Sequence, residues 1–414
     1  MVILAHPTGN TFVRAAARAL HSAGLLAAFH TTVVAPGDNL LRPLPDRVRR
    51  QILRRRFDEV PPDMVRTHPW REVVRLTALA LDARWLTNPG AWASIDAVYE
   101  RFDGRVARDI AGLPRETSVS AVYAYEDAAL RTFRAAHGRG LACIYELPIA
   151  YWESTQRLLR EEAERLPEWG ATLHGIDDSP EKLERKSQEI DLADTVVVPS
   201  RFVLGTLPAH IRQAKPCIVA PFGSPEPARG AAAADGKDPH GRLRVLFAGS
   251  MTQRKGLADL FAAMRLLHRS DVELVVMGSP ITPMSFYRGQ YPDFTYEPPR
   301  PHDQVLALMR SCHILALPAI VEGRALVQQE ALASGLPILV TANAGGEDLV
   351  EDGRTGFLVP TRSPEAIAER IAWFADHREL LAGMRVCALQ KAADTGWSHY
   401  EAQVREAVKA AAIR

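Results

Sequence analysis

The sequence predicts an α/β protein made of two Rossmann-like domains that face each other across a cleft. Short apolar runs alternate with amphipathic stretches, a pattern typical of parallel, doubly wound sheets. The length of 414 residues exceeds what one hydrophobic core usually spans. A stretch rich in Pro, Gly, Ala and Asp, from Pro221 to Arg242, separates two strongly patterned regions. We therefore predict an interdomain linker at residues 226–242.

The first domain is predicted over residues 1–225. It opens with the apolar run VILA, residues 2–5, and a helix is expected over residues 12–24. Further strands are predicted near residues 120–123, 141–146 and 195–199, with helices between them.

The second domain, predicted over residues 243–395, has a more regular pattern. The elements expected in chain order are a strand at 243–249, a helix at 256–268, a strand at 272–278, a helix at 303–311, a strand at 313–317, a helix at 326–334 and a strand at 337–340. Strands that alternate with helices in this way predict a parallel sheet.

Composition excludes several classes of protein. A net charge of +1 argues against a nucleic-acid binder. The four cysteines show neither CxxC nor metal-ligand spacing, which favours free thiols in a reducing compartment. The amino-terminal MVILAHPTGN resembles no signal peptide, and no apolar run approaches the length of a membrane span. We therefore expect a soluble cytoplasmic protein.

Two carboxylates stand out in the second domain. Glu322 and Glu330 lie eight residues apart, the first in a loop after a strand and the second on the following helix. Both should face the crevice at the carboxyl end of the sheet, where open α/β folds bind ligands. There, one carboxylate can accept hydrogen bonds from sugar hydroxyls and the other from a ribose. The alternative is an ordinary helix with a solvated face and two unrelated glutamates.

The start of the same helix is suited to an anion. The backbone amides there would face a phosphate, and they belong to Gly323, Arg324, Ala325 and Leu326. A second phosphate-binding segment opens the domain, where Gly249 follows a strand while Arg254 and Lys255 precede the next helix. It lacks the glycine order of a P-loop and of GxGxxG, so a basic solvated turn is the alternative.

Taken in order, these segments resemble the retaining GT-B glycosyltransferases of family GT4. The G-R-x-x-x-x-K-G signature of the family is echoed from Gly249 to Gly256, and its E-x7-E element from Glu322 to Glu330. NAGGEDLVEDGRTGFLVP, residues 343–360, is similar to a further family segment. The last residues, 396–414, resemble the terminal helix that in this family crosses back to the first domain.

The resemblance implies roles for these residues. Glu322 would hold the hydroxyls of the donor sugar, Glu330 would bind the ribose, and Lys255 would neutralise the leaving diphosphate. The sequence has no DxD triplet and no metal-ligand cluster, so we expect metal-independent transfer without a cofactor. Attack from the same face as the leaving group would retain the anomeric configuration, since no carboxylate is clearly placed as a covalent nucleophile.

In the first domain, the resemblance points to His6 and Gly9 at the early glycine loop, where they would lie near the diphosphate or the acceptor. Glu146 stands near the position of a histidine found in many family members and is a candidate acceptor-side base, although it can equally cap the strand end. His6 can equally be a structural hydrogen-bonding group.

The sequence departs from the family pattern at Ser250 and at the pair Arg324 and Ala325. Ser250 stands where the family usually has an arginine, and Arg254 or Arg324 can substitute for the missing cation. Arg324 and Ala325 replace the usual Phe-Gly, which changes a side chain over the donor pocket and keeps the amides.

A basic segment concerns partners. From Arg42 to Arg56 there are seven arginines and one acid, with apolar residues at helical spacing. Such a segment can lie on an anionic membrane surface or clamp an anionic acceptor. Peripheral contact with the inner face of a membrane is therefore one expectation.

The sequence leaves the donor nucleotide open between UDP, GDP and ADP, and the acceptor open between a glycan, a glycolipid and a small molecule. Two alternatives to a transferase are also open. One is a noncatalytic subunit that binds nucleotide sugars, and the other is a different GT-B enzyme such as an epimerase.

Overall fold

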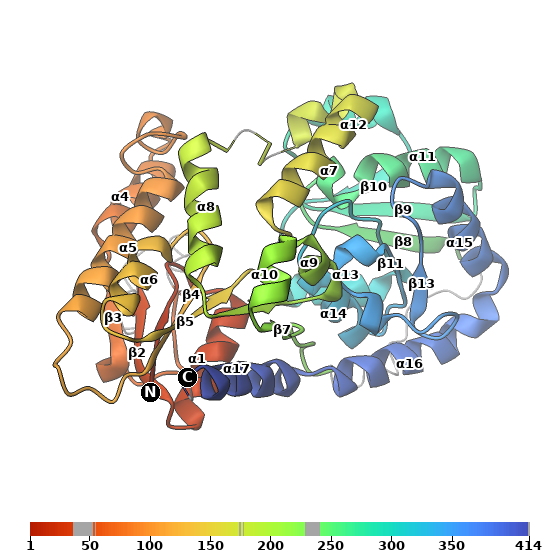
Figure 1. Cartoon of the computed structure of the whole chain (residues 1–414). Helices are drawn as coiled ribbons and strands as arrows, with labels where there is room; N and C mark the ends of the chain where they lie inside the picture. Colours follow the sequence, from red (N-terminus) through yellow and green to blue (C-terminus); the bar gives the residue numbers. More distant parts are fainter. Residues whose placement is uncertain (36–52, 54, 174, 177, 228–240, 413–414) are drawn as a thin grey trace.

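The structure is a computed structural model that describes residues 1–35, 53, 55–173, 175–176, 178–227 and 241–412. Within these ranges the strands form two parallel sheets, one in each half of the chain (Figure 1). The predicted α/β architecture with two Rossmann-like domains is therefore confirmed.

The sheet of the first half has seven strands in the order β3-β2-β1-β4-β5-β6-β7. Its strands are β1 (Val2–Ala5), β2 (Leu26–Thr31), β3 (Val65–Thr67), β4 (Ala121–Tyr125), β5 (Ala142–Glu146), β6 (Thr195–Val198) and β7 (Cys217–Val219). Every residue of β1, β4 and β6 is buried, as expected for strands covered by helices on both faces.

The sheet of the second half has six strands in the order β10-β9-β8-β11-β12-β13. Its strands are β8 (Leu243–Ala248), β9 (Val272–Met277), β10 (Phe294–Glu297), β11 (Ile314–Leu317), β12 (Ile338–Val340) and β13 (Gly356–Leu358). The order reverses between β8 and β11, so the crevice at this switch point is where an open parallel sheet binds ligands.

Helices cover both sheets. In the first half they are α1 (Thr11–Ser22), α4 (Trp70–Ala80), α5 (Ile95–Ala111), α6 (Leu130–His137), α7 (Trp152–Arg165), α8 (Pro180–Leu192), α9 (Arg201–Thr206) and α10 (Ala209–Ala214). In the second half they are α11 (Leu257–Leu267), α12 (Met284–Gln290), α13 (His302–Ser311), α14 (Leu326–Ala333), α15 (Pro364–Asp376), α16 (Leu381–Asp394) and α17 (Trp397–Ala412).

Several elements are additions to the sequence prediction, namely β2, β3, β7, β10 and β13. Most of these strands lie toward the edges of the sheets and carry polar residues, as in VRT of β3 and FTYE of β10. A short strand with mixed polarity gives no clear period-2 signal. These strands are therefore identified by their pairing with a neighbouring strand rather than by their own sequence pattern.

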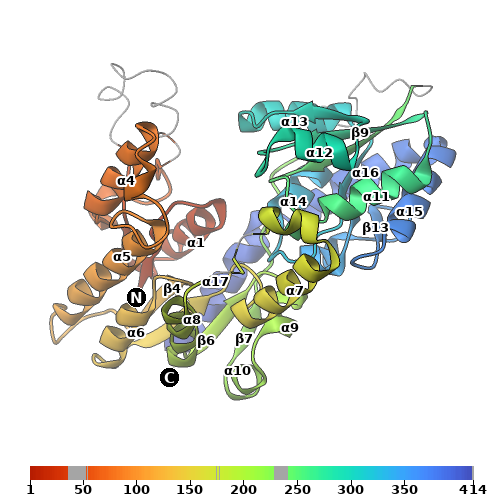
Figure 2. The same ribbon diagram turned by 90° about the horizontal axis from the view of Figure 1, so that it is seen from above.

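One segment of the first half packs on the second. Trp169, in the turn after α7, is 1% exposed and belongs to the hydrophobic core around β8–β13. Arg165 pairs with Asp259 of α11 at 2.9 Å. Figure 2 shows α7 beside α11 accordingly. The predicted boundaries 1–225 and 243–395 remain a prediction, with this segment of the first range lying against the second.

The terminal helix α17 returns to the first half. It packs against α1 and β5, and it lies on the same side of the first half as the amino terminus in Figure 1. Four of its apolar side chains belong to the core around β1 and β4, namely Val404, Ala407, Val408 and Ala411. The segment that resembles the family's terminal helix therefore crosses back as expected.

The basic segment predicted from Arg42 to Arg56 lies mostly outside the described residues. Of its arginines, the structure describes Arg55, which pairs with the buried Glu72, and Arg56, which pairs with Asp58 at 2.7 Å. Across the described ranges, no helix combines the length and apolarity required to cross a bilayer. The predicted membrane contact remains a prediction.

Candidate functional site

A cleft of about 1360 Å³ lies between the two halves of the molecule. The second half contributes residues that follow the carboxyl ends of its strands, including Gly249 after β8 and Glu322 after β11. The first half contributes Phe12, Pro148, Ile149 and Phe222. The cleft therefore has the position at which parallel sheets bind ligands, with walls from both domains.

The central pair of the cleft is Lys255 and Glu322. The Nζ atom of Lys255 lies 2.6 Å from Oε1 of Glu322, and a guanidinium nitrogen of Arg254 lies 3.2 Å from the same oxygen. Burial alone would raise the pKa of Glu322, but Lys255 and Arg254 outweigh it and lower the pKa below its ordinary value. Glu322 is therefore a carboxylate at neutral pH.

Two glycines allow this pair to form. Gly249 has φ +145°, and a Cβ there would lie 2.8 Å from Cδ of Lys255. Gly256 is left-handed at φ +77°, and a Cβ there would lie 2.0 Å from the carbonyl oxygen of Pro318. The glycines at both ends of the predicted phosphate segment therefore let the Lys255 side chain lie along the backbone and reach Glu322.

Glu330 lies on α14, as predicted, and lines the same cleft. Its Oε1 is 3.7 Å from Nδ1 of His302, the first residue of α13. Burial raises the pKa of Glu330, and the nearby His302 opposes this rise. The structure thus brings the two predicted carboxylates and the predicted lysine into one cleft.

Gly323 joins the two halves at the floor of the cleft. A Cβ on Gly323 would lie 1.8 Å from the carbonyl oxygen of Pro148, so only glycine permits this approach. The hydroxyl of Ser200 donates a hydrogen bond to the Gly323 carbonyl at 2.7 Å. The amide of Ala325, expected to face a phosphate, instead donates to the carbonyl of Ala344 at 3.2 Å.

Arg324 was expected beside a bound phosphate, but in the structure its side chain contacts other protein groups. Its side chain is 1% exposed and forms a two-point ion pair with Asp348, at 2.5 and 3.0 Å. It also donates to the carbonyl of Phe222 at 3.1 Å. The guanidinium is therefore engaged within the protein. Ser250 is exposed outside the cleft lining. Arg254 is also outside this lining, but its contact with Glu322 makes it the second cation of the Lys255–Glu322 pair.

His6 and Gly9 lie beside the cleft rather than in its lining. His6 is 5% exposed, its ring packs edge-on against Tyr125, and its Nδ1 lies against the amide nitrogen of Thr8 at 2.9 Å and against the Thr8 carbonyl oxygen. Burial lowers the pKa of His6 to about 4, although the contact with the Thr8 carbonyl opposes this. A Cβ on Gly9 would lie 2.3 Å from Phe57, so Gly9 serves packing. Of the two alternatives for His6, this geometry fits the structural one.

The surroundings of Glu146 differ from those expected for the predicted acceptor-side base. Its side chain is 1% exposed at the end of β5, where its oxygens accept hydrogen bonds from Tyr123 at 2.7 Å and from Tyr400 of α17 at 3.0 Å. Burial raises its pKa to about 7, while the phenol hydrogen bonds lower it. A carboxylate sealed beneath the terminal helix cannot reach an acceptor. Glu146 therefore anchors α17 and is not placed as an acceptor-side base.

Sequence reasoning did not assign the residues that line the first-domain wall, Phe12, Pro148, Ile149 and Phe222. Pro148 and Ile149 lie in the loop after β5, so the rule that ligands bind beyond carboxyl strand ends was the available signal. Phe12 is in the first turn of α1 and stacks on Phe222 at 4.7 Å, a contact that no local pattern predicts.

Two domains with parallel sheets, a returning terminal helix and an interdomain cleft with a lysine–glutamate pair define the GT-B class of protein. Residues 231–388 match the family described as glycosyl transferases group 1. This match covers most of the second domain and agrees with the resemblance of the sequence motifs to family GT4.

Curated relatives agree with this family. The chain is 30% identical over 261 residues to a D-inositol 3-phosphate glycosyltransferase of Streptomyces scabiei, covering 57% of this chain and 58% of the relative. It is 32% identical over 177 residues to D-inositol 3-phosphate glycosyltransferase 1 of Catenulispora acidiphila, covering 39% and 42%. The chain therefore spans 58% of the first relative's own length and 42% of the second's.

Solved structures share the fold over the whole chain. Sucrose-phosphate synthase from Thermosynechococcus elongatus superposes with a TM-score of 0.66 at 16% identity, covering 98% of this chain and 97% of that one. The Anabaena protein HepE, in complex with UDP and glucose, superposes with a TM-score of 0.61 at 14% identity, covering 99% of both chains. At such identities, the likeness concerns the fold.

Proposed function

We propose that the protein transfers a sugar from a nucleotide-diphosphate sugar to a hydroxyl of an acceptor, with retention of anomeric configuration and without a metal ion in that step. The observation that carries this proposal is the contact of Lys255 with Glu322, 2.6 Å apart in a cleft lined by both domains. The pair combines a cation suited to a diphosphate with a carboxylate suited to sugar hydroxyls.

The donor would lie along the second domain. Lys255 and Arg254 would offset the charge that develops on the departing diphosphate, together with amides at the start of α14. Glu322, held as a carboxylate by these cations, would accept hydrogen bonds from the hydroxyls of the transferred sugar. Glu330 would accept from the ribose. Catalysis would then be chiefly electrostatic and positional, because the groups are already oriented in the cleft.

The acceptor is the finer part of the proposal. The relatives are named for D-inositol 3-phosphate, which supports a polyhydroxylated ring as the acceptor class. Among the described residues, the first-domain side chains in the cleft are apolar, namely Phe12, Pro148, Ile149 and Phe222. This wall suits the apolar face of a ring. Glycans, glycolipids and small molecules with such a ring therefore belong in one acceptor panel.

The first experiment measures donor binding by thermal shift with UDP-, GDP- and ADP-sugars, since a bound donor stabilises the fold according to its affinity. One nucleotide class should raise the melting temperature of the wild type. Lys255→Ala and Glu322→Gln should reduce that shift. Lys391→Ala and Glu351→Gln are matched controls, because they change the same charges in an ion pair between α16 and the segment before β13, outside the cleft. Equal loss in the controls would contradict the assigned roles.

The second experiment follows transfer to the acceptor panel by NMR of the anomeric proton, with and without a chelator. Retained configuration and a rate unaffected by the chelator are expected. An inverted product or chelator-sensitive transfer would overturn that part of the proposal. Donor binding without turnover for any acceptor would instead favour a noncatalytic binding subunit.

A further inference from the structure

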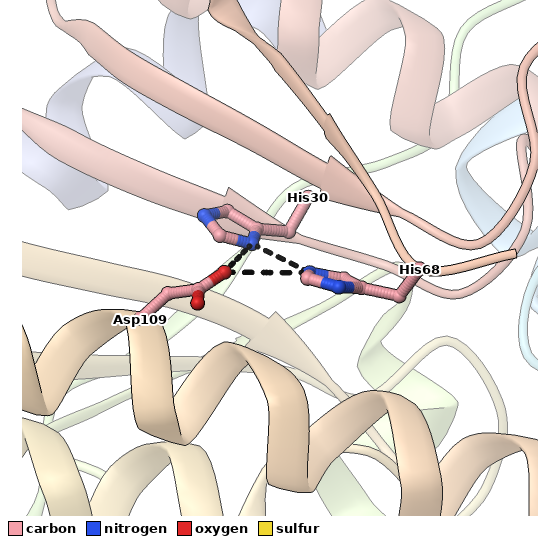
Figure 3. Close-up of side chains that lie close together, drawn as sticks. All are labelled: His30, His68 and Asp109. Carbon is pink, nitrogen blue, oxygen red and sulfur yellow. Dashed lines mark hydrogen bonds and ion pairs between the residues drawn. The ribbon is translucent and has the colours of Figure 1, made fainter.

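Three side chains with metal-binding atoms meet in the first domain, away from the cleft. They are His30 at the end of β2, His68 directly after β3, and Asp109 near the end of α5. Figure 3 shows the two imidazoles and the carboxylate pointing toward one another. Nδ1 of His30 lies 3.2 Å from Nε2 of His68, and both nitrogens lie 3.6 Å from Oδ2 of Asp109.

The sheet register brings the two histidines together. In the parallel pair of β2 with β3, His30 is opposite Arg66. His68 comes two residues after Arg66, where the chain continues in the direction of β3. Residues two apart in a strand point to the same face of a sheet, so His68 follows Arg66 to the face that His30 occupies. The amide of His68 donates to the carbonyl of Thr31 at 2.9 Å and continues the ladder. Helix α5 lies on this face and adds Asp109.

The three atoms have the spacing of ligands to one metal ion. The point equidistant from them in their common plane is about 2.0 Å from each atom, which is the usual length of zinc–nitrogen and zinc–oxygen bonds. Their separations are also close to the roughly 3.3 Å edge of a tetrahedron with such bonds. A four-coordinate ion lies out of this plane, so the two 3.6 Å separations would shorten by about 0.3 Å on binding, and a fourth position would stay open.

Within the cluster, one contact is short enough for a hydrogen bond. A single N–H can bridge the two ring nitrogens, while Oδ2 of Asp109 is farther from both than a normal hydrogen bond. Burial, with His68 and Arg66, lowers the pKa of His30 to about 3. Burial and Arg105 lower that of His68, although Asp109 opposes them.

The surroundings of the cluster affect how a metal ion would reach it and how strongly nearby positive charges would oppose its binding. The Asp109 side chain is 48% exposed, and His68 also lines a cavity of about 490 Å³, so an ion can enter from solvent. Arg66 and Arg105 lie near enough to repel a cation. The binding free energy from two imidazoles and one carboxylate must outweigh this repulsion. Imidazole ligands bind transition metals more tightly than hard ions such as Mg²⁺, so a transition metal is favoured.

We propose that His30, His68 and Asp109 bind one divalent transition-metal ion of the zinc class. The ion would tie the edge strand β3 to β2 and α5 and stabilise this side of the first domain. None of the three ligands lines the interdomain cleft, so the ion has no part in the proposed transfer step. The sequence showed no metal-ligand cluster because 38 residues separate the two histidines.

A second cluster, His137 with Cys143 and Asp194, is less suited to a metal. The Asp194 carboxylate already accepts a hydrogen bond from the amide of Cys143 at 2.7 Å. Burial raises the pKa of the Cys143 thiol, whereas a metal requires the thiolate. This cluster therefore provides a comparison for the experiment.

The experiment uses the full chain, freed of metal by a chelator, and titrates it with Zn²⁺ against a chromophoric chelator and with Co²⁺ by visible absorption. One equivalent should bind to the wild type, with the absorption of four-coordinate Co²⁺, and Zn²⁺ should raise the melting temperature. His68→Gln and Asp109→Asn should each weaken binding at least about tenfold, since the loss of even an outer-shell partner has that effect. Both positions are less buried than His30, so these variants should fold.

Controls separate this proposal from others. His210→Gln removes an exposed histidine paired with Asp191 at 3.1 Å and should leave Zn²⁺ affinity unchanged. The proposal is overturned if the wild type binds no stoichiometric ion, if His68→Gln and Asp109→Asn bind as the wild type does, or if His137→Gln abolishes binding instead. Nucleotide-sugar thermal shifts should be equal in the wild type and Asp109→Asn, so failure here and failure of the transferase proposal are distinguishable.

Discussion

The phenol of Tyr400, in the last helix, donates a hydrogen bond of 3.0 Å to the carboxylate of Glu146, 254 residues earlier in the chain. Both side chains are buried, and Tyr123 donates a second hydrogen bond to the same carboxylate at 2.7 Å. This contact fixes the returning helix α17 on the first domain. Because α17 follows the second domain, it also helps to hold the two walls of the cleft together.

Tyr400→Phe should therefore loosen the terminal helix. The variant keeps the ring and removes one hydrogen bond to a buried carboxylate, which should cost about 1–3 kcal/mol in the free energy of unfolding. Urea denaturation followed by circular dichroism measures this. Tyr296→Phe removes a phenol that bonds to the Gly278 carbonyl at 3.1 Å in the second domain and serves as the control. Wild-type stability in Tyr400→Phe would refute the anchoring role of Tyr400.

The raised pKa of Glu146 should also make the stability of the protein depend on pH. Burial raises its pKa in the folded protein from 4.5 to about 7. Between these values the folded protein holds a proton that the unfolded chain has released, so the contribution of Glu146 to stability falls as pH rises and is constant above about pH 7. By this linkage the total change is about 3 kcal/mol.

Glu146→Gln replaces the titrating group with a neutral one and should remove this change. The free energy of unfolding of the variant minus that of the wild type should therefore increase from pH 5 to pH 8, by up to about 3 kcal/mol. Taking the difference cancels other buried acids, including Glu189, whose pKa burial raises to about 8. A difference that stays flat across this range would show that Glu146 has an ordinary pKa.

Gly323→Ala should separate the domains. The added Cβ would lie 1.8 Å from the Pro148 carbonyl oxygen, so one backbone must move away from the other. We expect a destabilisation of about 1–3 kcal/mol, as for other overpacked sites, and a larger radius of gyration. Denaturation and small-angle scattering measure the two effects. Gly289→Ala, in α12 with open space around it, should be neutral or slightly stabilising.

Arg324→Met tests whether this arginine binds protein or phosphate. The variant loses the ion pair with Asp348 and the hydrogen bond to Phe222, so stability should fall by about 2 kcal/mol. Donor affinity should change less than about threefold, whereas Lys255→Ala should weaken it at least about tenfold, a difference of more than 1 kcal/mol in binding. Calorimetric titration with the donor identified by thermal shift measures both. A larger loss of donor affinity in Arg324→Met than in Lys255→Ala would reverse the assignment.

The sequence by itself determined the two-domain α/β fold and the main partners in the cleft. The apolar runs of β1 and β8 are buried throughout or nearly so, and a local pattern of burial is what periodicity records. Lys255 and Glu322 could be predicted together because each follows a strand of one parallel sheet, and the carboxyl ends of such strands converge.

Only the tertiary structure decided which distant segments cover or bind residues whose local sequence patterns are similar. Glu146 also follows a strand, yet α17 covers it, and the local sequence carries no sign of a helix that returns 254 residues later. Arg324 lies in the predicted phosphate loop, yet Asp348 binds it. His30, His68 and Asp109 meet because β3 pairs at the sheet edge and α5 packs across it. Side-chain patterns report the burial of their own element, whereas long-range neighbours depend on how the elements cross and pack.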